Sequence, residues 1–305
     1  SMAALHTLLG ARLQRNQPLA RYTAARLGGP ADYLYVARES VDELGEVVMT
    51  AWSMGMPVRV LGGGANVLVS DAGVRGLVVI NKVSQVDFGD WHDGRTMAAS
   101  SGTALTLLAH KCQVAGLAGM EWAVAVPGTV GGAVVNNAGA HGTDTAAALA
   151  DTVVLEASKG PQIYSNAEMH YAYRGSQLKA RDDRHFLVLL ATFVLPHDDP
   201  AAIKARMADF NAYRKRTQPN GASLGSIFKN PPGDYAGRLI EAAGLKGQRA
   251  GGVMVSPVHA NFFINDGTAT ASDYHTLIRR VQESVAAQFS ITLELEIELV
   301  GEWTV

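Results

Sequence analysis

VPGTVGGAVVNNAGAHG, which spans residues 126–142, is the segment around which the rest of this chain is most easily understood. It contains five glycines among small side chains. Glycine allows a positive φ and lets another group approach the backbone with no Cβ in the way. Backbone N–H groups in such a segment can surround a phosphate or a diphosphate. The alternative is a tight turn that needs only the positive φ.

A second segment of the same character, LGGGANVLVSD, spans residues 61–71 and follows a β-rich run at 57–60. Ligands of α/β sheets tend to bind where a strand ends, which is where this segment lies. Two glycine-rich segments in one chain can hold the two ends of one diphosphate cofactor. Each of them is also compatible with a structural turn alone.

The composition is that of a globular protein. The chain has 305 residues, of which 48% are hydrophobic and 18% charged, and its net charge is −2. This length predicts two or three domains, and the near-neutral charge argues against nucleic-acid binding. The most apolar run, residues 186–195, is much shorter than the roughly 20 residues of a membrane-spanning helix. We therefore expect no nucleic-acid partner, no membrane insertion and a cytoplasmic location.

Cysteine and histidine usage gives no sign of a bound metal. The single cysteine, Cys112, excludes an internal disulfide and a cysteine cluster for zinc or iron–sulfur. The nine histidines have neither the HxH nor the HExxH spacing. We therefore expect no metal site. The sequence shows no signal-peptide pattern, and we interpret Ser1, before Met2, as a remnant of tag cleavage.

The pattern of apolar residues alternates between helical and strand periods. We expect helices near residues 40–55, 103–115, 199–216, 235–243 and 274–289. The first opens on a capping-box pattern, and the last carries its apolar residues on one face. We expect strands at residues 57–60, 67–70, 77–80, 152–157, 186–195, 261–265 and 292–300. This order predicts α/β units followed by a further carboxyl-terminal unit.

Three polar side chains are the main candidates for chemistry. Ser226 lies in GSIFKNP, where a hydroxyl could face a ligand, although a turn serine is equally compatible; the segment is not a GxSxG elbow. Arg174, in HYAYRGS, could bind a carboxylate through paired hydrogen bonds, or form a surface ion pair. Glu296 is one of three alternating glutamates on the expected last strand, a pattern that usually marks a solvated face.

Three further residues are weaker candidates. His259, in SPVHAN, could contact a ligand phosphate, although a lone histidine beside an apolar strand is more often structural. Lys229 and Asn230 follow Ser226 closely and have a similar standing.

Eight short motifs of this chain resemble, in the same order, those of one enzyme family. They are RLGGPAD, GGGANVLVSD, VPGTVGGAVVNNAGAHG, YAYRGS, GSIFKNP, GLKG, SPVHANFFIN and LELEIELVG. On these motifs the chain resembles the UDP-N-acetylenolpyruvoylglucosamine reductase (MurB) family over nearly its whole length. One motif alone would be weak, whereas all of them in order favour function over the structural alternatives.

The resemblance implies an α+β protein. A vanillyl-alcohol-oxidase/PCMH-type FAD-binding fold of two α/β subdomains would be followed by a C-terminal α+β substrate domain. We expect FAD-binding subdomains at residues 1–80 and 81–197 and the substrate-binding domain at 198–305, with the last strand able to return to the FAD domain.

The resemblance also implies noncovalent FAD, with NADPH as the co-substrate. No histidine lies in residues 61–71, so a covalent flavin link is not expected there. The cofactor-binding residues it implies are Gly62, Gly63, Gly64, Ala65, Asn66, Val67, Pro127, Gly128, Thr129, Gly131, Gly132, Asn137, Ala138 and Gly142.

The implied reaction is the reduction of UDP-N-acetylglucosamine enolpyruvate to UDP-N-acetylmuramate, a peptidoglycan precursor. Hydride from the reduced flavin adds to C3 of the enolpyruvyl group. Arg174 would then stabilise the charge that develops on the substrate carboxylate, and Ser226 would protonate C2 as the general acid. Glu296 would steady the intermediate. Implied substrate contacts are Tyr173, Arg174, Lys229, Asn230 and His259.

The chain departs from the family pattern in its connections and its basic residues. The short connection between Leu195 and Tyr213 leaves no room for the inserted segment with a gating tyrosine that some members carry. We therefore expect the shorter subclass. We also expect a monomer, although the sequence itself does not determine the oligomeric state. Thr217 stands where some members place a lysine, which leaves Arg214 or Arg216 for the substrate diphosphate.

His141 stands where tyrosine is usual.

Two other functions remain open at this stage. One is another FAD-dependent oxidoreductase of the same fold that acts on a small hydroxy acid. The other is a non-catalytic FAD electron-relay subunit, against which GSIFKNP and Glu296 argue, since a relay needs no proton donor.

Overall fold

The computed structural model of this protein describes residues 2–303, so Ser1, our interpreted cleavage remnant, lies outside the described residues. The chain divides into two compact units. Unit 1 contains the residues up to Gln14, Leu34–Gly63 and Gly76–Arg214. Unit 2 contains Arg15–Tyr33, Gly64–Arg75 and the residues from Lys215 onward. Each unit is therefore assembled from segments that are distant in the sequence.

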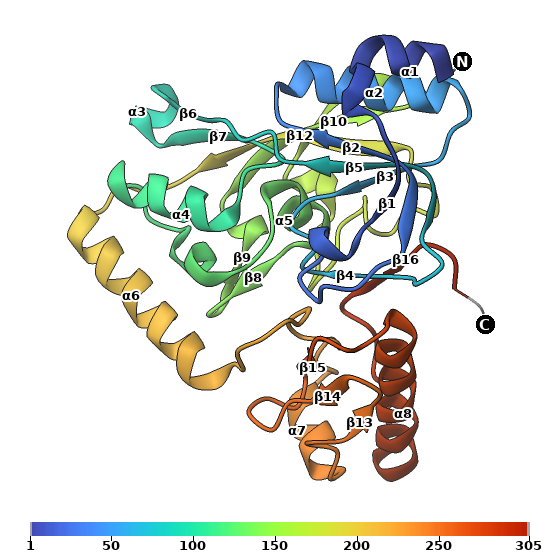
Figure 1. The fold of residues 1–305 in the computed structure, drawn as a ribbon. Coiled ribbons are helices and arrows are strands. Elements are labelled where there is room, and N and C mark those ends of the chain that lie inside the picture. Colours follow the sequence, from blue (N-terminus) through green and yellow to red (C-terminus); the bar gives the residue numbers. More distant parts are fainter. Residues whose placement is uncertain (1, 304–305) are drawn as a thin grey trace. The chain divides into compact units, whose positions relative to one another are not determined.

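An antiparallel five-stranded sheet forms the centre of unit 1, with the strand order β11-β10-β12-β7-β6 (Figure 1). Its strands are β6 Val86–Gly89, β7 Thr96–Ser100, β10 Leu149–Glu156, β11 Gly160–Ser165 and β12 Phe186–Val194. The most apolar strand, β12, lies in the middle and pairs with both β10 and β7. Two helices, α4 (Leu105–Val114) and α5 (Val130–Asn136), complete the apolar core on this sheet.

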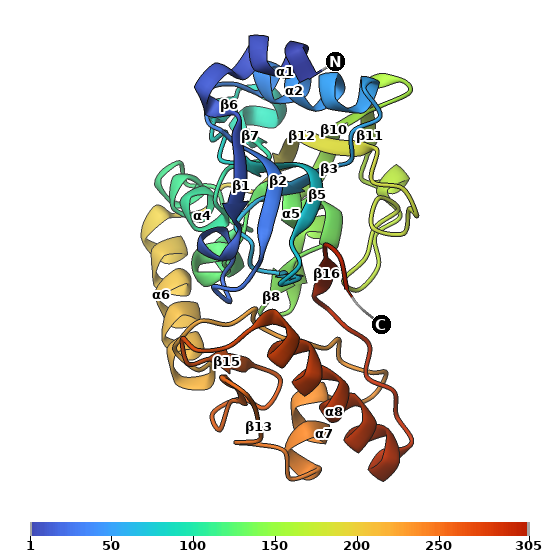
Figure 2. The same ribbon diagram turned by 45° about the vertical axis from the view of Figure 1, so that its right-hand side comes forward.

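A second sheet has the order β1-β2-β5-β3, and β3 runs parallel to β5. Its strands are β1 Gln14–Pro18, β2 Pro30–Ala37, β3 Val58–Leu61 and β5 Val74–Asn81. Helices α1 (Met2–Leu9) and α2 (Val41–Ser53) lie side by side (Figure 2). The Ser40 hydroxyl caps α2 by accepting from the Glu43 N–H at 3.0 Å.

The remaining elements of unit 1 are short, apart from one long helix. They are α3 Trp91–Gly94 and the hairpin of β8 (Gly139–Ala140) and β9 (Thr143–Asp144). The long helix α6 (Pro200–Thr217) begins in unit 1 and buries only Ile203 and Met207. Arg206 holds it in place by donating to the nearly buried Glu121 carboxylate at 2.8 and 3.0 Å.

Unit 2 is built on a small antiparallel sheet and two helices. Its elements are β13 Arg249–Ala250, β14 Val253–Val255, β15 Phe263–Asn265, α7 Ala236–Ala242 and α8 Ala271–Phe289. The last strand, β16 (Glu298–Val300), pairs in parallel with β4 (Val67–Val69). Phe228, Phe263 and Tyr274 are among the largest buried side chains of the apolar core between these elements.

The structure confirms the expected α+β class and the helices expected over 103–115, 199–216, 235–243 and 274–289. The strand expected over 292–300 is wrong in length: only its last three residues pair as a strand, while Leu295 makes an isolated bridge to Phe228. The glycine-rich segment 126–142 is not one continuous turn, because α5 occupies its middle.

Candidate cofactor and substrate sites

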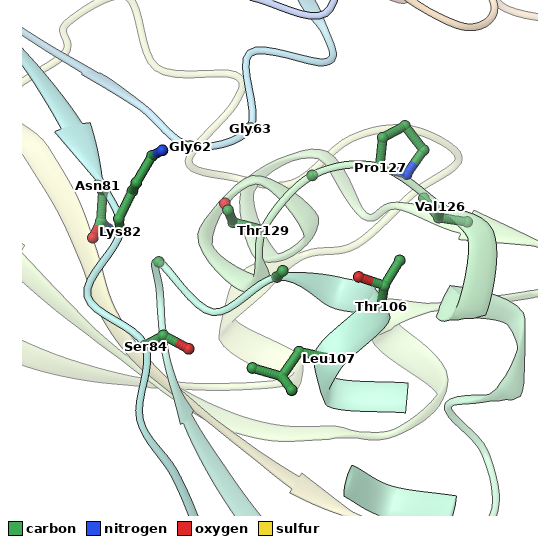
Figure 3. Close-up of a pocket in the computed structure, with 13 residues that line it drawn as sticks. Gly62, Gly63, Asn81, Lys82, Ser84, Thr106, Leu107, Val126, Pro127 and Thr129 are labelled. Carbon is green, nitrogen blue, oxygen red and sulfur yellow. The ribbon is translucent and has the colours of Figure 1, made fainter. Parts of the chain in front are cut away.

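A pocket of about 350 Å³ opens in unit 1 where four segments of chain meet (Figure 3). The segments are the loop after β3, the end of β5, the turn between β7 and α4, and the residues before α5. Five of the expected cofactor residues line it: Gly62, Gly63, Pro127, Gly128 and Thr129. The two glycine-rich segments of the sequence therefore form two walls of the same pocket.

The two walls approach so closely that side chains would not fit between them. A Cβ on Gly62 would lie 2.2 Å from Thr129 Oγ1, and one on Gly63 would lie 3.0 Å from the Gly128 Cα. Gly128 itself has a φ of 119°, which L side chains rarely adopt. Glycine backbone without Cβ atoms thus borders this part of the pocket, and backbone of this kind can bind a diphosphate through its N–H groups. The residues present fit a dinucleotide cofactor.

Other residues of the pocket carried no signal in the sequence. The end of β5 and the residues after it contribute Asn81, Lys82 and Ser84, while the turn before α4 and the first turn of α4 contribute Gly102 and Thr106, among others. Nothing in the local sequence distinguishes these residues from an ordinary strand end. Only the folded path of the chain brings them to the pocket, so a motif search could not have found them.

The expected cofactor residues Gly64, Ala65, Asn66 and Val67 belong to unit 2. Gly64 has a φ of 60°, and a Cβ there would lie 2.1 Å from the Tyr22 carbonyl oxygen. The Asn66 side chain donates to the Glu296 carbonyl at 3.2 Å, and the Asn66 carbonyl accepts from the Glu298 N–H at 2.9 Å. This part of the loop therefore positions the chain around Glu296.

The remaining expected cofactor residues lie on α5 and the hairpin that follows it: Gly131, Gly132, Asn137, Ala138 and Gly142. None of them lines the pocket described above. Asn137 is buried and left-handed, with a φ of 48°. Its side chain bonds to Asp144, to the Ala172 carbonyl and to the Ala146 N–H. Asn137 thus shapes the loop through bonds within the chain.

Arg174 stands at the tip of a tight turn that is tied down on both sides. The Tyr171 hydroxyl donates to the Val134 carbonyl at 2.8 Å, and the buried Ser176 hydroxyl donates to the Val135 carbonyl at 2.6 Å. The Arg174 guanidinium donates to the Gly139 carbonyl at 3.0 Å. These bonds fix the turn against α5 and the loop after it.

The exposed ring of Tyr173 lies beside this guanidinium, whose carbon is 5.4 Å from the ring centroid. Arg174 has a φ of 52°, which non-glycine residues adopt infrequently. Backbone strain of this kind often accompanies a functional side chain. The pair Tyr173–Arg174 is therefore presented together by one rigid turn.

Ser226 and Glu296 lie on neighbouring backbone segments of unit 2. The Glu296 N–H donates to the Ile227 carbonyl at 2.8 Å, and the Ile227 N–H donates to the Asn261 carbonyl at 2.9 Å. Asn261 is buried, and its side chain bonds to both the N–H and the carbonyl of Phe228, at 3.0 and 2.9 Å. The GSIFKNP segment is thereby held between residues 261–262 and 294–296, which fixes the half-buried Ser226.

The other expected substrate contacts also belong to unit 2. The Lys229 ammonium lies 3.6 Å from the exposed Glu294 carboxylate. The side-chain oxygen of Asn230 accepts a hydrogen bond from the N–H of Ala236, the first residue of α7, at 3.0 Å. The structure therefore separates the three glutamates, since Glu294 is exposed while Glu296 and Glu298 are half-buried.

His259 is fixed by its own backbone surroundings. Its Nδ1 accepts from the Asn261 N–H at 3.2 Å, and its ring packs on Phe262 with 4.7 Å between centroids. Burial lowers the pKa of His259, and the positive charge of Lys246 lowers it further. The neutral ring therefore carries its proton on Nε2, because Nδ1 acts as the acceptor.

The His141 side chain makes aromatic contacts with α6. Its ring stacks on Phe210 of α6, with 4.0 Å between centroids and 6° between planes, and Tyr213 meets it edge-on. Partial burial and the charge of Arg214 lower the pKa of His141. Burial also lowers the pKa of the Arg214 guanidinium.

Within residues 2–303, no group of three or more histidine, cysteine or acidic side chains is arranged to hold a metal ion. No helix in the described part of the chain is long and apolar enough to cross a membrane.

Two family models match the chain in succession. A model described as an FAD binding domain matches residues 33–155. A model described as the C-terminal domain of UDP-N-acetylenolpyruvoylglucosamine reductase matches residues 217–300. The first covers the pocket residues through Thr129, and the second covers Ser226, His259 and Glu296.

Similar proteins align over nearly the whole chain. UDP-N-acetylenolpyruvoylglucosamine reductase of Rubrobacter xylanophilus is 44% identical over 291 residues, which are 94% of this chain and 95% of that protein. The enzyme of the same name from Chloroflexus aggregans is 41% identical over 292 residues, or 94% and 97% of the two chains. The crystal structure of UDP-N-acetylenolpyruvylglucosamine reductase from Thermus caldophilus matches with a TM-score of 0.78 at 36% identity, covering 95% of this chain and 99% of that one.

Proposed function

The chain belongs to the UDP-N-acetylenolpyruvoylglucosamine reductase family, and from this premise we propose how its residues carry out the reaction. The enzyme is an FAD-dependent oxidoreductase that uses NADPH to reduce UDP-N-acetylglucosamine enolpyruvate to UDP-N-acetylmuramate for peptidoglycan synthesis. The observation that carries this conclusion is the alignment of more than nine-tenths of the chain with enzymes of that name.

The residues where the two glycine-rich segments meet would hold the cofactor diphosphate. Gly62, Gly63, Gly128 and Thr129 hold it through backbone N–H groups, and the close approach of these residues supports the assignment. The other expected cofactor contacts, on residues 64–67 and on 131–142, remain part of the proposal. When bound, FAD would supply the hydride chemistry that links NADPH to C3 of the enolpyruvyl group.

Arg174 stabilises the negative charge that develops on the substrate carboxylate when hydride adds at C3. A guanidinium can bind both carboxylate oxygens at once, and a preorganised cation of this kind lowers the barrier most when it does not have to move. The bond to the Gly139 carbonyl and the anchored turn support this role, because they fix the guanidinium in advance. Tyr173 contacts the substrate from the same turn.

Ser226 donates its hydroxyl proton to C2 and Glu296 steadies the charged intermediate. A serine hydroxyl is a weak acid, but the enediolate-like intermediate is a strong base and the proton moves over one contact distance. The backbone hydrogen bond from Glu296 to Ile227 supports a joint role, because it keeps Ser226 and Glu296 on adjacent segments. Lys229, Asn230 and His259 contact the rest of the substrate.

The proposal also covers the contact to the substrate diphosphate, the domain boundaries, the oligomeric state and the location of the enzyme. Arg214 or Arg216 binds the substrate diphosphate in place of the lysine that some family members carry at the position of Thr217. Residues 1–80 and 81–197 form the two FAD-binding subdomains, and residues 198–305 form the substrate domain. The enzyme is a monomer of the shorter subclass and acts in the cytoplasm.

The experiment is an anaerobic stopped-flow measurement of the flavin spectrum in two stages. NADPH first reduces the enzyme, and UDP-N-acetylglucosamine enolpyruvate is then added. We expect rapid return of the oxidised flavin bands. Ser226→Ala should leave reduction by NADPH unchanged and slow reoxidation by roughly 10²-fold, the usual scale for a positioned acid. Ser223→Ala, three residues earlier in the same loop, is the matched control and should behave like the parent enzyme.

The outcomes separate the proposal from its alternatives. Flavin that reduces but stays reduced with this substrate would favour a different acceptor or an electron-relay role. An absence of flavin bands would overturn the cofactor assignment. Equal reoxidation rates in Ser226→Ala and Ser223→Ala would remove Ser226 from the role of acid while leaving the activity itself intact.

A further inference from the structure

Lys82 is the one charged residue among those that line the pocket in the described part of unit 1. It follows directly on strand β5 and precedes β6. Figure 3 shows its side chain running from the strand end toward the loop at Gly62 and Gly63, which line the same pocket. No motif of the sequence pointed to this residue.

The backbone that carries Lys82 is held rigidly on both sides. The Lys82 N–H donates to the Ala37 carbonyl at 2.9 Å. The buried Asn81 side chain accepts from the Val83 N–H at 3.2 Å and donates to the Ser101 hydroxyl at 2.8 Å. A residue at this position therefore begins from a fixed Cα, and only its own rotamers determine where the ammonium lies.

The charge of Lys82 is not balanced by the protein. No acidic residue lines the pocket, and the structure gives Lys82 no carboxylate partner within residues 2–303. The other lining residues are uncharged: they are glycines such as Gly62, Gly63 and Gly128, a few apolar residues, and polar side chains such as Thr129. A full positive charge beside glycine backbone is complementary to an anionic phosphate group.

We propose that Lys82 binds the diphosphate of FAD as its counter-ion, an inference that rests on the proposed function. Lysine binds phosphate as a point charge on a flexible stem, so contact does not require the fork geometry of arginine. Asn81 acts as a positioning residue, since its side chain bonds to the Ser101 hydroxyl and the Val83 N–H and so fixes the neighbouring backbone. Because Lys82 is exposed at the rim, salt screens its interaction with the diphosphate.

The test measures the dissociation constant of FAD by flavin fluorescence during serial dilution of the flavin-loaded protein, at several salt concentrations. Lys82→Met keeps the length of the side chain and removes the charge. It should weaken FAD binding about tenfold at low salt, near the lower end for a hydrogen bond to a charged group because the site is exposed. It should also flatten the dependence of affinity on salt.

Two further variants keep the result interpretable. Lys82→Arg retains the charge. Its FAD dissociation constant should lie within about threefold of that of the parent protein, a smaller change than the tenfold loss expected for Lys82→Met. Lys111→Met removes an exposed lysine of α4 that does not line the pocket, and should change neither affinity nor salt dependence.

The inference is overturned if Lys82→Met binds FAD as tightly as Lys111→Met, or if its affinity falls with an unchanged salt dependence. Either result would leave the proposed function standing, since the parent protein would still bind flavin. If the parent protein itself bound no flavin, the proposed function and this inference would both fail.

Discussion

Replacing Gly62 with alanine should weaken FAD binding, because the new methyl group would occupy space that Thr129 already fills. A Cβ at Gly62 would lie 2.2 Å from Thr129 Oγ1 and 3.1 Å from its Cγ2. The φ of Gly62 lies outside the left-handed region, so the penalty is steric and not conformational. Overpacking of this kind costs about 1–3 kcal/mol, or roughly 5- to 150-fold in a dissociation constant if the two walls must close on the cofactor.

The assay is the FAD dissociation constant of each variant in a double-mutant cycle. Thr129→Ala removes the two nearest atoms and leaves only the Thr129 Cβ, at 3.2 Å; the Thr129 hydroxyl makes no capping bond to α5, so the double variant should regain affinity. We expect a coupling energy of about 1 kcal/mol or more between the two positions. Gly45→Ala on α2 is the control, since a Cβ there meets only Leu155, at an ordinary 3.6 Å. Unchanged affinity in Gly62→Ala, or no coupling, would refute the close approach of the two walls.

Three other predictions concern the substrate-side residues. Arg174→Ala should raise the KM for UDP-N-acetylglucosamine enolpyruvate and lower kcat in steady-state assays; an unchanged kcat would limit it to binding. Asn261→Ala leaves the backbone N–H and carbonyl of Phe228 without partners, so urea denaturation should show a loss of about 2–4 kcal/mol in unfolding free energy. His259 has a pKa below its ordinary 6.5 in the folded state, so the unfolded chain binds more protons and stability falls as pH drops through that value. His259→Asn should reduce the loss of thermal stability between pH 7.5 and 5.5, about one unit either side of the ordinary pKa; an identical loss would argue against this histidine as the source.

Long elements were predictable from the sequence because their apolar period is sustained. The apolar residues of α8 recur at the helical period over the whole segment, so the segment cannot be taken for a strand. Strand β12 is a short, nearly continuous apolar run of the length typical of a buried strand. The segment 292–300 shows the limit of this reasoning. Its alternation predicted one long strand, but Leu295 pairs with Phe228 and β16 pairs with β4, so two different partners divide it. Local alternation does not reveal which distant segment a strand pairs with.

The candidate site was predictable only where its chemistry leaves a mark in one short segment. Glycines leave such a mark, and Gly62 and Gly128 proved to line one pocket. Lys82 leaves none, because a lysine after a strand is ordinary and its value comes from what the fold places opposite it. Asn137 is the opposite case. It lies within a diagnostic motif, yet its side chain makes its hydrogen bonds to other residues of the chain.

The loop GGGAN combines both kinds of residue within a single motif. Gly62 and Gly63 form a wall of the pocket in unit 1, whereas Asn66 bonds to the backbone at Glu296 and Glu298 in unit 2. A substitution in the glycines should therefore alter flavin affinity, and a substitution of Asn66 should alter how the Glu296 segment is held. The motif looks uniform in sequence, although its residues meet two different requirements. The glycines provide backbone without a Cβ, and Asn66 provides an amide that bonds to backbone. Measurements that read flavin affinity and substrate turnover separately will distinguish the two, whereas an activity assay alone would attribute both to cofactor binding.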